Sequence, residues 1–312
     1  MSFPVFDLHC DTALVLAQRD IDLASNDAHI DLLRASELPG YCQCFACFTT
    51  PFMEQWGEGS PRQVFQAEMD AITRELNRNN SIIRQVFTAE DIQTNLGSGI
   101  MSAILTIEGP AGFGFDPAAL EDLYRTGFRI TTLGWNEDNA LTGSHVTGGG
   151  LTDLGREYVR EAQRLGMLID VSHISDRGFY DIMDITQAPV IASHSNSRSV
   201  CDVSRNLTDD MFIQICKTGG VAGFNQCAPF VGVSPGVEES CKHFLHFLEL
   251  DPDGKHIALG GDLDGCDQLP IGFDGVQDYP ALAAALMNRG IDQTLAKDIF
   301  WNNAFRVFKT CR

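Results

Sequence analysis

The chain has 312 residues, of which 44% are hydrophobic and 21% are charged, the composition of an ordinary globular protein with an ample core. Its formal net charge of −20 argues against nucleic acid and against an anionic membrane surface as partners. No signal-peptide pattern precedes the first apolar segment, and no apolar run approaches the roughly 18 residues of a membrane span. We therefore expect a cytoplasmic protein whose ten cysteines are mostly buried and reduced.

Eight short apolar segments alternate with helical patterns along the chain. Strands are expected at residues 5–8, 43–49, 101–107, 129–133, 167–171, 188–192, 220–224 and 256–259. Helices are expected at residues 30–36, from 61 onward, and at 118–126, 151–165, 175–185, 208–218, 237–249, 279–289 and 293–308. Near-continuous apolar strands are typical of a parallel sheet buried on both faces, and no glycine-rich nucleotide-binding motif follows the first strand. The sequence therefore predicts an α/β fold, a (β/α)8 TIM barrel of the metal-dependent hydrolase type, with residues 1–312 forming a single catalytic domain.

Three cysteines lie close together in the second expected strand, at Cys42, Cys44 and Cys47. Such a cluster could hold zinc or an iron–sulfur cluster together with a fourth ligand. On an extended strand, however, Cys44 and Cys47 face opposite sides. We therefore favour ordinary buried cysteines over a metal site.

Side chains that bind metals or transfer protons fall at the carboxyl ends of five expected strands. They are His9, Asp11, Glu108, His173, His194 and Asp262. His9 and Asp11 are two residues apart on an extended segment, so both can point toward one ion. In barrels of this type the carboxyl ends of the strands form the rim where the chemistry takes place. Each residue alone could be structural, but together they predict a metal-dependent active site.

Three histidines and three carboxylates suit zinc or another borderline divalent ion, without excluding cobalt or manganese, and their number favours two ions. None of the five lysines lies at the carboxyl end of an expected strand, so a carbamylated lysine cannot serve as the bridge. Glu108 is then the expected bridging ligand. That leaves His9 and Asp11 for one ion, His173 and His194 for the other, and the remaining carboxylate for proton transfer.

Six motifs follow one another at residues 7–12 (DLHCDT), 107–109 (IEG), 170–173 (DVSH), 192–195 (ASHS), 205–210 (RNLTDD) and 260–265 (GGDLDG). Together they resemble the successive motifs of the renal (membrane) dipeptidase family, peptidase family M19, in a bacterial-type form. Residues 303–308 resemble the closing helix of that family, so the resemblance runs along almost the whole chain.

The resemblance implies a metallo-dipeptidase that cleaves dipeptides, including those with a D-residue at the C-terminus. It implies two zinc ions per chain, bridged by a carboxylate and by a water or hydroxide that attacks the scissile carbonyl. The implied ligands are His9 and Asp11 on one ion, Glu108 on both ions, and His173 and His194 on the other. The resemblance also implies that Asp262 is the general acid/base and that Arg205 binds the substrate carboxylate. The family further suggests a homodimer.

The chain departs from the animal members of the family at one position. Those members carry a histidine just after the fourth strand that helps to hold the substrate carbonyl, where this chain has Trp135 followed by Asn136. An indole cannot act as a cationic stabiliser, so support for the oxyanion would come from the metal ions and from Asn136. We expect both residues to contact the substrate, with Trp135 as a wall of the pocket.

Two other functions remain open from the sequence. A barrel metallohydrolase could act on another amide, a lactone or a phosphoester, but His-x-Asp in place of His-x-His and a glutamate bridge argue against it. A barrel could also keep its metal centre only to bind or carry a small molecule, which Asp262 and Arg205 argue against. The preferred substrate side chains are not predicted, because residues 52–60, 136–150 and 225–236, which are expected to line the pocket, follow no regular pattern.

Overall fold

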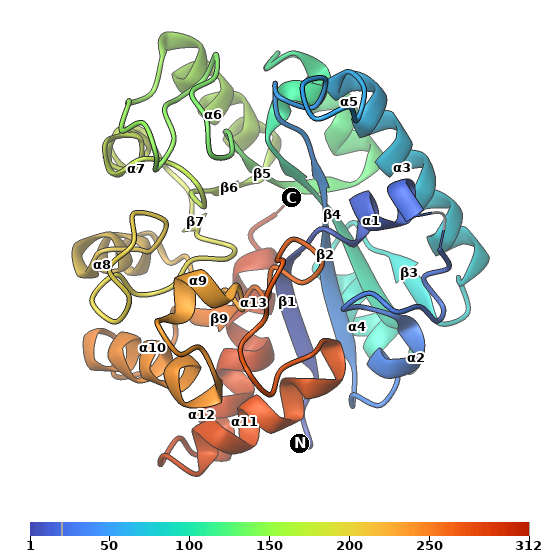
Figure 1. Ribbon diagram of the computed structural model, residues 1–312, viewed down its shortest axis with the longest axis vertical. Helices are drawn as coiled ribbons and strands as arrows, with labels where there is room; N and C mark the ends of the chain where they lie inside the picture. The colour runs from blue at the N-terminus through green and yellow to red at the C-terminus, as the bar shows by residue number, and fades with distance from the viewer. Residues whose placement is uncertain (20, 312) are drawn as a thin grey trace.

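Parallel strands form an almost closed barrel in the computed structural model, which describes residues 1–19 and 21–311 (Figure 1). The strands are β1 Val5–Cys10, β2 Tyr41–Phe48, β3 Ile83–Gln85, β4 Met101–Glu108, β5 Phe128–Thr132, β6 Leu168–Asp170, β7 Val190–Ile191, β8 Ala222–Phe224 and β9 Ile257–Leu259. Around the barrel they follow the order β7, β6, β5, β4, β2, β1, β9, β8, and a parallel bridge between Ala192 and Ala222 joins the two ends. The predicted barrel and its eight strands are confirmed.

Helices surround this barrel. They are α1 Thr12–Arg19, α2 Leu32–Ala35, α3 Pro61–Arg78, α4 Ala89–Gly97, α5 Ala119–Thr126, α6 Asp153–Leu165, α7 Asp176–Met183, α8 Asp209–Thr218, α9 Ala228–Val231, α10 Val237–Leu250, α11 Tyr279–Met287, α12 Gln293–Lys297 and α13 Asn303–Phe308, with short 3-10 turns at η1 Pro110–Phe113 and η2 Val276–Asp278. Local sequence explains many ends: Ser60 and Gln63 form a capping box at the start of α3, and α6 ends at Gly166 with a φ of 89°. Among residues 1–19 and 21–311, no helix combines the length and apolar character that a bilayer crossing requires.

Among the strands and α-helices, β3, α1, α4 and α9 were not predicted. β3 has three residues and α9 has four, too few for a periodic pattern to be recognised, and β3 pairs only with β4, beside the ring of strands. The helices α1 and α4 are no shorter than α5 and α7, which were predicted, so length does not explain why they were missed. The predicted helix at residues 293–308 is also wrong as a continuous α-helix, because residues Asp298–Asn302 form a π-helical turn, η3. This turn directs Trp301 into the cluster beneath the barrel, while Phe300 packs edge-on against Phe3 at 5.7 Å.

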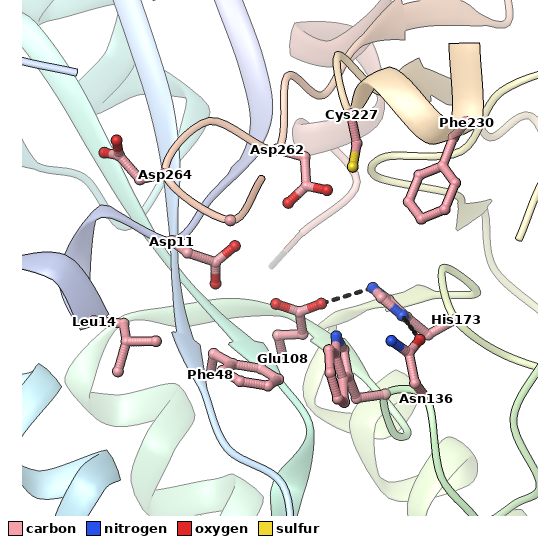
Figure 2. Close-up of a pocket in the computed structure, with 12 residues that line it drawn as sticks. Asp11, Leu14, Phe48, Glu108, Asn136, His173, Cys227, Phe230, Asp262 and Asp264 are labelled. Atoms are coloured by element: carbon pink, nitrogen blue, oxygen red, sulfur yellow. Dashed lines mark hydrogen bonds and ion pairs between the residues drawn. The ribbon is translucent and has the colours of Figure 1, made fainter. Parts of the chain in front are cut away.

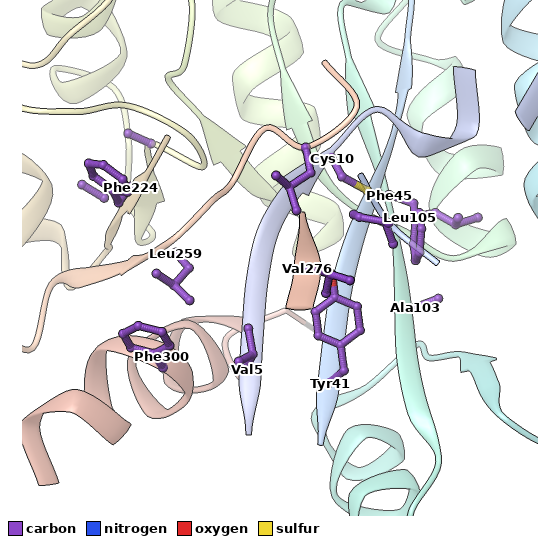
Figure 3. Close-up of a cluster of buried hydrophobic side chains, with 14 of the residues drawn as sticks. Val5, Cys10, Tyr41, Phe45, Ala103, Leu105, Phe224, Leu259, Val276 and Phe300 are labelled. Carbon is purple, nitrogen blue, oxygen red and sulfur yellow. The ribbon is translucent and has the colours of Figure 1, made fainter. Parts of the chain in front are cut away.

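The core divides into an interior and an outer layer. Alternate strand residues, among them Phe6, Ile104 and Ile130, fill the barrel and rest on Trp301 and Phe308 from the C-terminal segment. The other strand residues pack against the helices, as Figure 3 shows around Val5, Tyr41, Phe45, Leu105 and Leu259.

The three clustered cysteines of β2 are divided between these two layers. Cys42 and Cys44 belong to the interior, whereas Cys47 belongs to the outer layer. Side chains on opposite faces of one strand cannot bind the same ion, so the interpretation of these residues as buried cysteines agrees with the structure.

A bulge in β1 changes which side chains face the barrel axis. Asp7 pairs with Gln43 but Cys10 pairs with Phe45, so three steps along β1 match two steps along β2. Leu8 lies inside the barrel, and the extra residue then lets His9 turn toward the rim while Cys10 is buried in the outer layer. The Cys10 side chain therefore points away from the rim.

Close backbone contacts bring the ends of β7, β8 and β9 together. A Cβ on Gly260 would lie 1.6 Å from the carbonyl oxygen of Ser193, and one on Gly223 would lie 2.0 Å from the same atom. Only glycine permits this approach. The carboxyl ends of these strands therefore meet where Asp262 and His194 follow them.

Candidate metal centre and substrate pocket

The six side chains selected from the sequence at the barrel rim converge in the folded chain. His9 lies in the bulge of β1 and Asp11 directly follows that strand, Glu108 ends β4, and the other three follow β6, β7 and β9. Nε2 of His9 lies 3.3 Å from Oδ2 of Asp11 and 3.2 Å from Oε2 of Glu108. All six residues are buried. The fold thus brings together every residue that the sequence placed at this rim.

The two carboxylate oxygens of Glu108 face different histidines. Oε2 lies 3.2 Å from Nε2 of His9, whereas Oε1 lies 2.9 Å from Nε2 of His173 and 3.6 Å from Nε2 of His194. The candidate ligand atoms form two sets, and within each set the atoms lie within 4.8 Å of one another. One set comes from His9, Glu108 and His194, and the other from His9, Asp11 and Asp262. Glu108 thus divides the cluster, with His9 beside Oε2 and with His173 and His194 beside Oε1. A carboxylate placed in this way has the arrangement of a bridging ligand.

Hydrogen bonds to the outer ring nitrogens orient two of the histidines. Nδ1 of His173 donates to Oδ1 of Asn136 at 2.8 Å, because an amide oxygen can only accept (Figure 2). Nδ1 of His194 lies 2.6 Å from Oγ of Ser193, whose hydroxyl donates to the carboxylate of Asp170. Both rings therefore direct an unprotonated Nε2 inward, and these two atoms lie 2.9 Å apart. Contacts of this kind are typical of metal-binding histidines.

The polar atoms at the centre fit a divalent cation. Two imidazole lone pairs directed at one point, beside a carboxylate oxygen, repel one another unless a cation lies among them. Nε2 of His9 and Oδ1 of Asp11 are buried and have no hydrogen-bond partner within the described part of the chain. Imidazole and carboxylate are ligands that suit zinc and its neighbours in the transition series. The donor set is therefore that of a metal centre.

Burial strongly perturbs the acid–base properties of these groups. Burial, followed by the nearby charge of Glu108, raises the pKa of Asp11 to about 8. Burial and the positive charge of Arg205 lower the pKa of His173 to about 3, and burial also lowers the pKa of His194 well below its usual value. The two imidazoles are therefore neutral, as a metal ligand must be. The buried carboxylates require a nearby cation to stay ionised together at neutral pH.

Asp262 lies at the edge of the cluster, on the side of the pocket. Its Oδ1 is 3.8 Å from Nε2 of His9, and its Oδ2 accepts a hydrogen bond of 2.9 Å from Nδ2 of Asn225. Burial raises the pKa of Asp262, against the opposing charge of His9. Asp262 and His173 have φ values of 54° and 69°, which residues other than glycine rarely adopt. Such backbone conformations are concentrated at functional sites.

Arg205 is buried beside the cluster, and one edge of its guanidinium has no partner in the part of the chain that the structure describes. Nη1 donates to Oγ of Ser195 at 2.8 Å, and the guanidinium carbon lies 5.8 Å from the ring centre of Phe230, a residue of the pocket wall. Nε and Nη2 are buried and have no partner among the described residues. These two donors form the edge that binds a carboxylate with two parallel hydrogen bonds. Leaving them unpaired is costly, so an anionic ligand is the natural complement.

A cavity of about 210 Å³ opens beside the centre (Figure 2). It is lined by Asp11, Leu14, Phe48, Glu108, Trp135, Asn136, His173, Cys227, Phe230, Asp262, Asp264 and Gly265. Trp135 forms part of an aromatic wall, with ring centres 5.2 Å from Phe48 and 5.6 Å from Trp56. Acidic groups and apolar surfaces thus share a space that suits a small ligand with polar and apolar parts.

Some residues around the centre were missed in the sequence. Ser193 and Asp170, which orient His194, stand beside the expected ligands at strand ends, and this position could have identified them. His145 lies 2.8 Å from Oδ1 of Asn136 through its Nε2, beside His173 on the same oxygen. Its loop, residues 136–150, has no pattern from which this contact could be predicted.

Comparison with known proteins places these features in a family. The family described as membrane dipeptidase (peptidase family M19) matches residues 1–312. One uncharacterized dipeptidase of Schizosaccharomyces pombe is 31% identical over 301 residues, which cover 90% of this chain and 72% of that protein. A second from the same organism is 36% identical over 217 residues, or 67% of this chain, and the match spans only about half of its length (53%).

A solved structure agrees with these matches. A metallo peptidase from Rhodobacter sphaeroides, liganded with a phosphinate mimic of the dipeptide L-Ala-D-Ala, has a TM-score of 0.90 at 26% identity, with 100% of both chains covered. The barrel, the order of the motifs and the full-length family match therefore lead to one conclusion. This chain belongs to the membrane dipeptidase family, peptidase family M19.

Proposed function

We propose that this chain is a binuclear metallo-dipeptidase that hydrolyses the peptide bond of dipeptides. The observation that carries this proposal is the divided cluster around Glu108, with His9 beside one carboxylate oxygen and His173 and His194 beside the other. Membership of the family supports it. The dipeptide mimic bound by the Rhodobacter sphaeroides relative supports the class of substrate.

Two zinc ions per chain are the proposed cofactors. His9 and Asp11 would hold one ion, His173 and His194 the other, and Glu108 would bind both. When bound, such ions supply a hydroxide that is nucleophilic at neutral pH and polarise the scissile carbonyl. The neutral, oriented imidazoles of His173 and His194 support this assignment, as do Nε2 of His9 and Oδ1 of Asp11, which have no hydrogen-bond partner among the described residues.

The side chains around the centre bind the substrate and move the proton. Arg205 pairs its free Nε and Nη2 donors with the terminal carboxylate, which fixes the position of the peptide bond. Asp262 accepts a proton from the attacking water and delivers it to the leaving amine, while Asn225 holds its other oxygen. Trp135 closes one wall against water, and Asn136 lies where it can support the carbonyl oxygen as well as orient His173.

Dipeptides with a D-residue at the C-terminus belong to the proposed substrates. The terminal carboxylate is the part of the substrate that Arg205 recognises, and L- and D-residues share it. The relative with the L-Ala-D-Ala mimic supports this range.

We further propose that residues 1–312 act as one catalytic domain, in the cytoplasm and as a homodimer. A single barrel that carries all of the rim residues supports the first point. All ten cysteines lie in the described part of the chain and are free, as is typical of a reducing compartment. The homodimer follows from the family resemblance alone.

A substrate panel with reconstituted protein tests the proposed activity. Metal-free protein is loaded separately with zinc, cobalt or manganese and assayed with L-L and L-D dipeptides, a lactone and a phosphotriester. We expect the zinc-loaded protein to hold two ions per chain and to cleave only the dipeptides. Turnover restricted to the lactone or phosphotriester would indicate another metallohydrolase, and bound metal without any turnover would indicate a binding or carrier protein.

A further inference from the structure

Two cysteines that the proposed reaction does not use lie beside Asp262. Cys227, in the loop after β8, lines the pocket, and Cys266, in the loop after β9, is buried. The two Sγ atoms and a carboxylate oxygen of Asp262 all lie within 4.8 Å of one another. In Figure 2 the sulfur of Cys227 lies next to the Asp262 carboxylate. Sulfur and carboxylate donors therefore meet at the mouth of the site.

Backbone hydrogen bonds hold the two cysteine-bearing loops against each other. The N–H of Gln226 donates to the carbonyl of Gly261 at 3.1 Å, and the N–H of Ala228 donates to the carbonyl of Gln268 at 2.9 Å. These bonds join the residues on both sides of Cys227 to the loop that carries Cys266. The proximity of the thiols is thus a consequence of the fold and not of flexible side chains alone.

We propose that Cys227, Cys266 and Asp262 form a binding site for a soft or borderline divalent cation, such as Cd²⁺ or excess Zn²⁺, beside the metal centre. Two thiolates and one carboxylate are a donor set that such ions prefer. Because Cys227 borders the open pocket, water can supply a fourth ligand. On binding, each thiol loses its proton to solvent, and two metal–sulfur bonds and one metal–oxygen bond form.

The thiol at Cys266 is suited to remain inert until an ion arrives. Burial, together with the neighbouring Cys227 and Asp262, raises the pKa of Cys266 well above its usual value. The neutral thiol can therefore lie beside a carboxylate without repulsion, and a bound cation is what converts it to thiolate.

An ion at this site inhibits dipeptide hydrolysis, because it occupies the carboxylate of Asp262. This consequence rests on the proposed function, whereas the binding itself does not. The proposed ligands of the metal centre are imidazoles and carboxylates without sulfur. A thiolate-to-metal absorption band therefore reports on cysteines and not on that centre.

Titration of the zinc-loaded protein with Cd²⁺ tests the site. Ultraviolet absorption follows thiolate–cadmium charge transfer, and equilibrium dialysis counts bound cadmium. We expect the wild type to show the band, and both Cys227→Ser and Cys266→Ser to lose it together with one cadmium ion per chain. Cys201→Ser is the matched control, because Cys201 is a partly exposed cysteine whose thiol donates to the carbonyl of Pro229 at 3.7 Å, and it should keep the band.

Activity provides the second readout, with each variant compared with its own untreated sample. Cd²⁺ should inhibit the wild type and Cys201→Ser, while Cys266→Ser, which lies outside the pocket lining, should keep its basal activity and lose this inhibition. A band that persists in both site variants overturns the proposal, as does a band lost in Cys216→Ser, whose thiol lies near Asp251 and His256. If the band behaves as expected but no protein cleaves any dipeptide, the cation site stands and the proposed function fails.

Discussion

Nη1 of Arg205 donates to Oγ of Ser195 at 2.8 Å, while Nε and Nη2 of the buried guanidinium have no hydrogen-bond partner among residues 1–19 and 21–311. Ser195 directly follows His194, one of the two histidines beside Oε1 of Glu108. The end of one strand therefore orients both the proposed metal centre and the proposed carboxylate site. This arrangement ties the position of a bound carboxylate to the position of the centre.

Replacing Arg205 should weaken the binding of free dipeptides more than that of C-terminally amidated ones. Hydrogen bonds to a charged group contribute about 1.5–3 kcal/mol, so Arg205→Ala should raise KM for free dipeptides by about tenfold or more. Arg205→Lys keeps the charge but lacks the planar fork, and it should recover only part of the loss. Equal effects on free and amidated substrates, measured by steady-state kinetics, would remove Arg205 from carboxylate binding.

Asp262→Asn should abolish turnover while both metal ions stay bound. The amide is nearly isosteric and can still accept the hydrogen bond from Asn225, but it cannot take up a proton. General acid–base catalysis contributes about 10²–10⁴-fold to the rate, so kcat should fall by at least about 100-fold. Metal analysis of the same sample provides the control. Undiminished turnover in a fully loaded variant would exclude Asp262 from proton transfer.

Ser193→Ala and Ser195→Ala should change different properties, zinc affinity and KM respectively, although the two serines flank the same histidine. Ser193 links His194 to Asp170, so its loss should weaken zinc affinity by about 10–100-fold with little effect on KM at saturating zinc. Ser195 contacts Arg205, so its loss should raise KM and leave zinc affinity unchanged. Competition with a zinc chelator and steady-state kinetics measure the two effects. The same defect in both variants would contradict the division of roles.

In the metal-free protein, the free energy of unfolding should decrease as the pH rises from about 6.5 to 8. The pKa of Asp11, about 8 in the folded chain because of burial and Glu108, exceeds the ordinary value, so the folded state keeps a proton that the unfolded state has lost. Burial disfavours the charged form of His9, but the negative charges of Glu108 and Asp11 outweigh this effect and raise the pKa of His9. Above pH 6.5 the raised pKa of His9 therefore also makes the stability decrease as the pH rises. The lowered pKa values of His173 and His194 act oppositely, but only below about pH 6.5, where unfolded histidines are protonated.

Calorimetric melting of chelator-treated and zinc-loaded protein checks this dependence. Each proton that the folded state retains can lower the free energy of unfolding by at most about 1.4 kcal/mol per pH unit. Zinc should make this pH dependence weaker, because it holds Asp11 ionised. Asp11→Asn should reduce the slope of the metal-free protein without removing it, since burial also raises the pKa of Glu137 to about 7. A Tm of the metal-free wild type that rises from pH 6.5 to 8 would contradict the assignment.

The strands were predictable because each is a short apolar run followed by polar residues. Buried parallel strands must be apolar on both faces, so β4 and β6 stand out from composition alone. The elements that were missed, such as β3 and α9, are three and four residues long and derive their structure from neighbours. The π-helical turn at Asp298–Asn302 likewise depends on how Trp301 and Phe300 pack against distant residues, and the local sequence does not indicate this.

By itself, the sequence determined the barrel, the family resemblance and the set of metal-binding residue types at the strand ends, because these depend on residue type and spacing. Only the tertiary structure decided how those side chains are directed. The bulge in β1 turns His9 toward the rim, and contacts between loops distant in sequence bring Cys227 to Cys266 and leave one edge of Arg205 without a partner in the described part of the chain. Such directions follow from packing and hydrogen bonding across the fold, which spacing along the chain does not encode.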